Sequence, residues 1–276
     1  MEQHLQCGRY SLSLKMPLIM GILNLTDDSF SGDGLAGDPQ RAIAQGLRLV
    51  QDGAHILDIG AESSRPGAPV VSARQELERL LPVLAGLRDC GVPLSVDSLK
   101  PEVMREVLAA GADMINDIAA LQAPGALEAV AASRAAVCLM HMQGEPGSMQ
   151  RAPHYADVVG EVAGFLGQRV QAAKDAGIAA ERIVVDPGFG FGKTLEHNLC
   201  LLRHLRALNA AGRPLLVGLS RKSMLGLLTG RPAGERVPAS IAATLLALQR
   251  GAAMVRVHDV AATRDAIAVW NAVEER

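Results

Sequence analysis

Residues 183–194 read Ile-Val-Val-Asp-Pro-Gly-Phe-Gly-Phe-Gly-Lys-Thr, an apolar run followed by a carboxylate, three glycines and a lysine. The run is typical of a buried strand, and a helical pattern follows from Glu196, so the stretch predicts one strand–loop–helix unit. It fails as a nucleotide loop. Pro187 stands where a Walker A motif has its first glycine, and Lys193 stands where a dinucleotide fingerprint has its third. Another kind of site must explain the carboxylate and the glycines.

The same alternation of an apolar run and a helical pattern recurs along the chain. Each run ends in a polar or glycine-rich loop, as in parallel strands that are joined by helices. Eight such units predict an α/β fold of the (β/α)8 TIM barrel type, with an open doubly wound sheet as the structural alternative. The expected strands are 18–23, 55–59, 94–96, 114–118, 136–140, 183–185, 215–219 and 254–257, and the expected helices are 39–51, 72–88, 101–109, 126–132, 156–176, 196–210, 239–249 and 261–272.

The chain is predicted to form a single domain, 1–276, with a short N-terminal β-hairpin within residues 1–16. Residues 5–15 alternate apolar and polar side chains around Gly8-Arg9, which favours a hairpin that plugs one end of the barrel. No Pro/Ser-rich tract or long charge run divides the sequence. Loops 26–38 and 61–71 are long and follow expected strands, which indicates mobile substrate loops.

Composition excludes several classes of function. Hydrophobic residues make up 49% of the chain and aromatic residues 3%, so the core must be largely aliphatic. A net charge of -2 gives no reason to expect nucleic acid or an anionic membrane as partner. The first residues do not resemble a signal peptide and no apolar run approaches a membrane span, which predicts a cytoplasmic protein. Cys7, Cys90, Cys138 and Cys200 have neither metal nor disulfide spacing and are expected to be buried thiols.

Polar side chains at the carboxyl ends of the expected strands carry the functional prediction, because barrel enzymes place their active sites there. An Asp or Asn at a strand end can equally cap the next helix. Arg256 is more informative, because a guanidinium between buried valines needs a partner or an anionic ligand. Arg221 and Lys222 adjoin an expected helix start at Ser223, which favours an anion pocket. The polar residues in strand order are Asn24, Asp58, Glu62, Asp97, Asn116, Asp117, His141, Asp186, Ser220, Arg221, Lys222, Ser223, Arg256, His258 and Asp259.

Metal binding leaves only a faint trace in this sequence. None of the seven histidines forms a His-x-x-x-His pair, so a zinc site is not predicted. A Mg²⁺ ion held by one or two protein oxygens and a substrate phosphate needs no such motif, and Asn24 could supply an oxygen. Taken alone, Asn24 is more often a turn residue.

Six segments carry motifs that can be compared with known families: 20–24 with 28–31, 58–67 (Asp-Ile-Gly-Ala-Glu-Ser-Ser-Arg-Pro-Gly), 116–117, 140–144 (Met-His-Met-Gln-Gly), 186–193 and 218–223 (Gly-Leu-Ser-Arg-Lys-Ser). Together and in this order they resemble the dihydropteroate synthase family, the sulfonamide targets of folate synthesis. The resemblance runs from about residue 20 to 258. A methyl-tetrahydrofolate corrinoid methyltransferase-like barrel would share the pterin pocket but has no use for 220–223 or Arg256. A nucleotide-binding module is disfavoured by Pro187.

The resemblance implies that 6-hydroxymethyl-7,8-dihydropterin pyrophosphate condenses with p-aminobenzoate to give 7,8-dihydropteroate and pyrophosphate. It also implies Mg²⁺ as cofactor, sulfonamides as inhibitors and a homodimer. The implied catalytic residues are Asp186, Lys222, Arg256 and His258; the pterin site is Asp97, Asn116, Met140, Asp186 and Lys222; the pyrophosphate site is Asn24, Ser64, Arg256 and His258, with Asn24 as metal ligand; and the p-aminobenzoate site is Arg65, Pro66, Phe191, Ser220, Arg221 and Ser223, beside Lys222.

On this interpretation, Asp186 is the important group of the opening stretch, because a carboxylate can accept two N–H donors from the aminopyrimidinone edge of a pterin. The glycines are interpreted as bringing the backbone and Phe191 close to a flat substrate. Lys193 is expected to be peripheral. The phosphates are expected across the barrel mouth, near Arg256 and His258.

Overall fold

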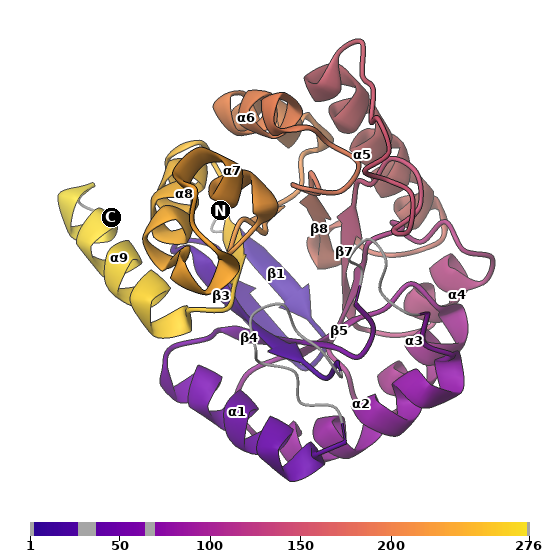
Figure 1. The fold of residues 1–276 in the computed structure, drawn as a ribbon. Helices are drawn as coiled ribbons and strands as arrows, with labels where there is room; N and C mark the ends of the chain where they lie inside the picture. Colours follow the sequence, from indigo (N-terminus) through magenta and orange to yellow (C-terminus); the bar gives the residue numbers. More distant parts are fainter. Residues whose placement is uncertain (1–2, 27–36, 64–69, 275–276) are drawn as a thin grey trace.

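Eight parallel strands form a barrel that is surrounded by helices (Figure 1). The computed structural model describes residues 3–26, 37–63 and 70–274. The strand order is β8-β7-β6-β5-β4-β3-β10-β9, and a parallel bridge between Val185 and Leu215 joins the two ends of this sheet. The predicted closed barrel is therefore confirmed over the open-sheet alternative. The strands are β3 (Leu18–Asn24), β4 (Ile56–Gly60), β5 (Leu94–Asp97), β6 (Met114–Asp117), β7 (Ala136–Met140), β8 (Ile183–Asp186), β9 (Leu216–Val217) and β10 (Met254–Val257).

Helices follow the strands at nearly the predicted positions. The main difference is in the expected helix 196–210, which ends early and continues as a 3-10 segment. Leu205 and Leu208 are both fully buried there, and their three-residue spacing suits a 3-10 turn. The helices are α1 (Pro39–Gln51), α2 (Ala73–Leu87), α3 (Pro101–Ala109), α4 (Ala126–Ala131), α5 (Val158–Asp175), α6 (Leu195–Arg203), α7 (Ser223–Thr229), α8 (Val237–Gln249) and α9 (Val260–Val273), with 3-10 turns η1 (Ala180–Arg182), η2 (Leu205–Ala211) and η3 (Ala233–Glu235).

The inside of the barrel changes from apolar to polar along several of its strands. Successive side chains of a strand face opposite sides, so alternate residues share the interior. Ile56 and Met254, at the amino ends of β4 and β10, belong to one buried apolar cluster inside the barrel. Two residues further along the same strands stand Asp58 and Arg256. The alternation of side chains therefore places an apolar layer at the amino end of the barrel interior and a polar layer above it, toward the carboxyl end.

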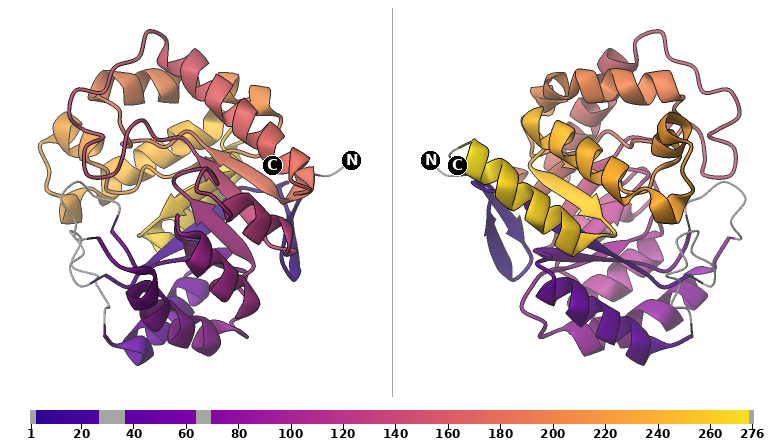
Figure 2. Two further views of the ribbon diagram at one scale, coloured as in Figure 1. Left: turned by 90° about the vertical axis from the view of Figure 1, so that its right-hand side faces the viewer. Right: turned by 60° about the vertical axis from the view of Figure 1, so that its left-hand side comes forward.

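The N-terminal hairpin, β1 (His4–Cys7) and β2 (Tyr10–Ser13), covers the amino end of the barrel, as predicted. Leu5 and Cys7 are fully buried and join the interior apolar cluster. Figure 2 shows the hairpin at one end of the barrel, close to the N-terminus. The opposite end is thus left for a site.

The prediction that all four cysteines are buried thiols is confirmed in part. All four cysteines are free; Cys7 and Cys138 are buried, but Cys90 and Cys200 are only partly buried. In residues 3–26, 37–63 and 70–274, no helix has the length and apolar character needed to cross a membrane.

A buried carboxylate fastens the hairpin to the barrel. Asp113 accepts hydrogen bonds from the backbone N–H of Arg9 (3.1 Å) and Leu94 (3.1 Å) and from the Arg9 guanidinium (3.0 Å). Its side chain is 2% exposed, whereas that of Arg9 is 44% exposed. The carboxylate therefore satisfies backbone donors of both the hairpin and β5.

We predict that Asp113→Ala lowers the free energy of unfolding by about 2 kcal/mol or more, because it leaves a buried N–H of Leu94 without its acceptor. Arg9→Ala should cost less than about 1 kcal/mol, because exposed ion pairs contribute little. Urea denaturation of both variants measures the difference. Equal losses in the two variants would contradict this explanation.

Candidate active site

A cavity of about 580 Å³ lies at the carboxyl ends of the barrel strands. All the predicted site residues within the described part of the chain line it. Ser64, Arg65 and Pro66 lie outside the described residues, as do most of the loops 26–38 and 61–71. The predicted residues that line the cavity are Asn24, Asp97, Asn116, Met140, Asp186, Phe191, Ser220, Arg221, Lys222, Ser223, Arg256 and His258.

Arg256 is held by two carboxylates inside the barrel. Its Nε donates to Asp58 Oδ2 at 2.5 Å and its Nη2 donates to Asp97 Oδ2 at 3.0 Å. Burial opposes the charge, but the two carboxylates raise the pKa of Arg256 above its ordinary value. Burial also raises the pKa of Asp97 to about 7, although Arg256 works against this shift. The partner that the sequence required for Arg256 is therefore a pair of aspartates.

Asp58, which the sequence placed among the polar strand ends without giving it a role in the site, is the carboxylate that fixes Arg256. It is fully buried, and it also accepts hydrogen bonds from Ser95 Oγ (2.6 Å) and Asn116 Nδ2 (3.1 Å). The bond to Asn116 sets which way that amide faces. A usable signal was present, since Asp58 stands as a charged residue within an apolar strand near its carboxyl end, as Arg256 does.

The loop after β8 is shaped by a neighbouring loop. Asp186 Oδ1 accepts from the backbone N–H of Gly188 at 2.7 Å, and burial raises the pKa of Asp186. Gly188 and Gly192 both have positive φ, at 67° and 60°. A Cβ on either would collide with a carbonyl oxygen, that of His141 or Gln143. These two glycines are therefore required by packing between loops, and their predicted role in the approach to a substrate stays a prediction.

Lys193 is buried behind the cavity wall rather than peripheral. Its side chain donates to the carbonyl oxygens of Gly188 and Phe191 and to His141 Nδ1, each at 2.9 Å. Burial and the nearby lysine lower the pKa of His141 to about 3, so its ring is neutral and can accept this bond. Burial lowers the pKa of Lys193 to about 7. The N–H donors of Lys193 are used inside the loop, so this lysine is not placed to bind a nucleotide phosphate. This argues against the nucleotide-loop alternative.

The Arg221-Lys222 pair divides into two environments. Lys222 Nζ lies 4.3 Å from the centroid of the Phe191 ring, a cation–π contact at the cavity wall. Arg221 instead pairs with Asp259 through Nε (3.0 Å) and Nη2 (2.6 Å). Asp259 balances the charge of Arg221, so Lys222 carries more of the predicted anion site. Ser223 begins α7, as the sequence predicted.

Ser220 contacts His258, which the sequence had placed in a different part of the site. The Ser220 Oγ and His258 Nδ1 atoms lie 3.0 Å apart, and the backbone N–H of His258 donates to the same hydroxyl at 3.2 Å. Ser220 thus fixes the histidine between β9 and β10. Its predicted contact with p-aminobenzoate stays a prediction.

Asn24 ends β3 and is paired in register with Gly60 of β4. Among the described residues, no group of three or more His, Cys, Asp and Glu side chains could hold a metal ion. One amide oxygen together with phosphate oxygens and water suits Mg²⁺, which seldom occupies a cage made of protein ligands alone. The donors at the cavity fit a Mg²⁺ ion that arrives with a phosphorylated substrate.

A closed barrel with charged groups around a cavity at its carboxyl end defines a TIM-barrel enzyme. Comparison with known proteins defines the family. The family model described as pterin binding enzyme matches residues 20–258. The dihydropteroate synthases of Neisseria meningitidis serogroup C and Escherichia coli K12 are 51% and 47% identical to the chain, over 99% and 95% of its length and 99% and 93% of theirs.

Solved structures give the same result. Burkholderia cenocepacia dihydropteroate synthase complexed with 7,8-dihydropteroate superposes with a TM-score of 0.91 at 51% identity, covering 99% of this chain and 97% of the other. The Xanthomonas albilineans enzyme with 4-aminobenzoic acid superposes with a TM-score of 0.92 at 53% identity. The Yersinia pestis enzyme with a sulfonamide drug complex superposes with a TM-score of 0.96 at 45% identity. These cover 100% and 99% of this chain and 100% of each other chain.

The chain therefore belongs to the dihydropteroate synthase family of pterin-binding enzymes. These enzymes are transferases of folate biosynthesis. The family assignment decides against the two alternatives, a corrinoid methyltransferase-like barrel and a nucleotide-binding module.

We predict that Lys193→Met lowers the free energy of unfolding by about 1–3 kcal/mol, because it removes the lysine donor to the carbonyl oxygen of Phe191 and one of the two donors to that of Gly188. Lys174→Met, at an exposed position of α5, is the control and should change stability by less than about 0.5 kcal/mol. Chemical denaturation measures both. Equal stability of the two variants would show that Lys193 does not support the loop.

Proposed function

We propose that the chain condenses 6-hydroxymethyl-7,8-dihydropterin pyrophosphate with p-aminobenzoate, giving 7,8-dihydropteroate and pyrophosphate. The observation that carries the proposal is the convergence of twelve predicted residues on one cavity of about 580 Å³, a size suited to small substrates. The bound product in the Burkholderia cenocepacia structure and the 4-aminobenzoic acid in the Xanthomonas albilineans structure support it.

The pterin occupies the inner part of the cavity in this proposal. Asp97, Asn116 and Asp186 all come from carboxyl ends of strands and face the barrel interior. Carboxylates and an amide match the donor-rich edge of an aminopyrimidinone. Met140 provides apolar surface for the pterin ring in this proposal, and Lys222 is assigned to the same pterin site.

The pyrophosphate lies against Arg256 and His258, with Ser64 as a further contact. A guanidinium has five N–H donors, and the bonds to Asp58 and Asp97 use two of them. Asn24 would help to hold a Mg²⁺ ion beside the phosphates, and this ion would supply charge neutralisation to the leaving group. The aspartates fix Arg256 in advance, so little reorganisation is needed when negative charge grows on the leaving oxygen.

The p-aminobenzoate binds at the outer wall in this proposal. Phe191 and Lys222 form one stacked pair there, and Arg221, Ser220 and Ser223 line the same side of the cavity, with Arg65 and Pro66 as predicted contacts. Lys222 can attract the carboxylate while Phe191 packs against the ring. Sulfonamides, one of which is bound in the Yersinia pestis structure, are expected at this wall. The homodimer, the single-domain organisation and the cytoplasmic location stay predictions.

The direct test is release of pyrophosphate by the purified protein with Mg²⁺, the pterin pyrophosphate and p-aminobenzoate. Lys222→Ala and Arg256→Ala should each lose at least about tenfold in kcat/KM, which corresponds to about 1.4 kcal/mol of transition-state stabilisation. Lys174→Ala is the matched surface control and should match the wild type. No pyrophosphate from the wild type would refute the function, and wild-type rates in either variant would refute that residue's role.

A pH dependence of pterin binding follows from Asp97. The ionised carboxylate is the form that accepts N–H donors, and a pKa of about 7 means that this form is lost as the pH falls through neutrality. Affinity for 6-hydroxymethylpterin should therefore decrease between pH 8 and pH 6. Asp97→Asn should bind more weakly and show a shallower pH dependence. Calorimetric titration measures both, and equal slopes in the two proteins would contradict the assignment.

A further inference from the structure

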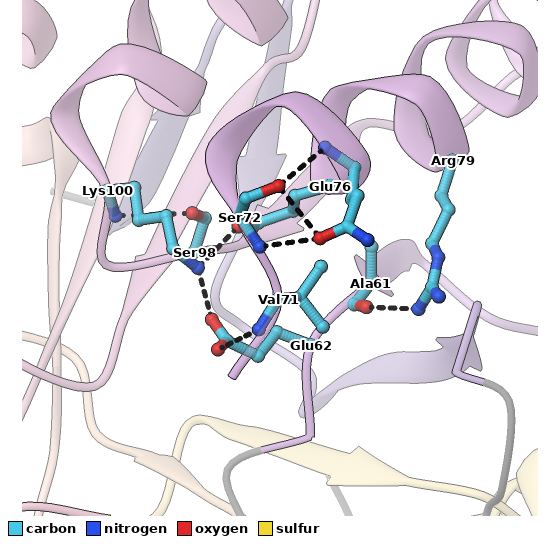
Figure 3. Close-up of polar contacts among 9 residues, drawn as sticks. Ala61, Glu62, Val71, Ser72, Glu76, Arg79, Ser98 and Lys100 are labelled. Carbon is cyan, nitrogen blue, oxygen red and sulfur yellow. Dashed lines mark hydrogen bonds and ion pairs between the residues drawn. The ribbon is translucent and has the colours of Figure 1, made fainter. Parts of the chain in front are cut away.

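Two cations that the proposed mechanism does not use make different kinds of contact at the cavity. Lys100 donates to Glu62, which lines the cavity after β4, and at 2.8 Å to Glu76 of α2 (Figure 3). These bonds join charged side chains to one another. Arg236 immediately precedes α8, lines the cavity itself and donates to backbone carbonyl oxygens. Arg236 therefore acts on the path of the main chain.

The guanidinium of Arg236 is bonded to the loop between β9 and α7. Its Nη1 donates to the carbonyl oxygens of Arg221 (3.1 Å) and Lys222 (3.4 Å), and its Nε donates to that of Arg231 (2.8 Å). These bonds use three of the five N–H donors of a guanidinium. The remaining nitrogen, Nη2, lies against Gly226 of α7, where an added Cβ would overlap with it. The guanidinium is thus engaged with the protein although it lines the cavity.

The loop needs this support because Arg221 has an unusual backbone conformation. Its φ is 56°, which is uncommon for a residue with a side chain and persists where the surroundings impose it. The backbone N–H of Arg221 donates to the Oγ of Ser240 at 2.9 Å, and that buried hydroxyl donates to the carbonyl oxygen of Arg236 at 2.7 Å. The start of α8 therefore holds both the N–H and the carbonyl group of Arg221.

Lys222 follows Arg221 directly, so the backbone of Arg221 sets where the side chain of Lys222 begins. The Lys222 ammonium lies over the Phe191 ring at the cavity wall. It also acts on Asp186: burial raises the pKa of Asp186, and the charge of Lys222 is among those that oppose this shift. A displaced Lys222 would therefore change the surroundings of both proposed substrates.

We propose that Arg236 is a positioning residue that acts through Lys222. Its guanidinium fixes the carbonyl oxygens of Arg221 and Lys222, and it thereby holds the Lys222 ammonium at the cavity wall. This inference rests on the proposed function, which assigns Lys222 to the pterin site and to the attraction of the p-aminobenzoate carboxylate. Arg236 should then matter for the reaction only while Lys222 is present.

A double-mutant cycle tests this dependence. Arg236→Met should lower kcat/KM about fivefold to tenfold in the wild-type background but less than about twofold in the Lys222→Ala background, because the group that it positions is then absent. Arg231→Met is the matched control. Its guanidinium forms an exposed ion pair with Glu235 at 2.9 Å, so its removal should leave kcat/KM within about twofold of the wild type.

Gly226→Ala tests the position of the guanidinium without removing a charge. The added methyl group would displace the flexible end of Arg236, while alanine suits the interior of α7. We expect the same loss of kcat/KM as in Arg236→Met, and no further loss when the two changes are combined. In both single variants the Arg221 amide, which donates to Ser240, should exchange its hydrogen faster than in Arg231→Met.

A loss of kcat/KM that persists in the Lys222→Ala background would overturn the inference, because Arg236 would then contact a substrate itself or support the fold in general. Wild-type kcat/KM in Arg236→Met, or unchanged exchange of the Arg221 amide, would overturn it as well. The proposed function fails separately, if the wild type releases no pyrophosphate. Exchange of the Arg221 amide then still decides whether Arg236 holds the loop.

Discussion

The buried bond between Arg256 and Asp58 is the interaction on which the arrangement of the site depends. The two residues are 198 positions apart in sequence, and the parallel pairing of β3 with both β10 and β4 brings them together. A charged pair inside a barrel is costly to dehydrate, and it is tolerated only when further hydrogen bonds satisfy the remaining atoms. Ser95, Asn116 and Asp97 provide those bonds. The groups proposed to recognise the pterin are thus the same groups that satisfy the buried charge.

This double use explains how the side chains of the polar layer are held by one another. Asp97 and Asn116 are held by Arg256 and Asp58, so their side chains have fixed directions before a substrate arrives. Preorganised polar groups in a poorly hydrated cavity stabilise developing charge more effectively than groups that must first reorient. The charges of this layer also act on one another: burial raises the pKa of Asp97, and the nearby carboxylates of Asp58 and Glu76 raise it further.

The sequence predicted the fold and the composition of the cavity well, because both follow from short-range periodicity. A strand exposes alternate residues to one side, and barrels place their sites at the carboxyl ends of the strands, so Asp97, Asn116, Asp186 and Arg256 could be placed without coordinates. Partners could not be predicted in the same way. The pairing of Arg256 with Asp58 depends on the register of strands on either side of the closure, and no local pattern records that register. The assignment of residue roles came from the family resemblance alone.

The loop from Asp186 to Lys193 shows why composition misleads about loops in particular. Three glycines and a lysine resemble a phosphate loop because both need positive φ and donors close to the backbone. Here the carbonyl oxygens of His141 and Gln143 exclude side chains at Gly188 and Gly192, and Lys193 donates inward to the loop's own carbonyls. The lysine that lines the cavity is Lys222, from the next strand–loop unit, and its ammonium group lies over the Phe191 ring. The glycine-rich loop therefore supplies Phe191 to the cavity wall, and the loop after β9 places Lys222 against it. The contact between these two loops shows that Lys222, and not Lys193, belongs to the site.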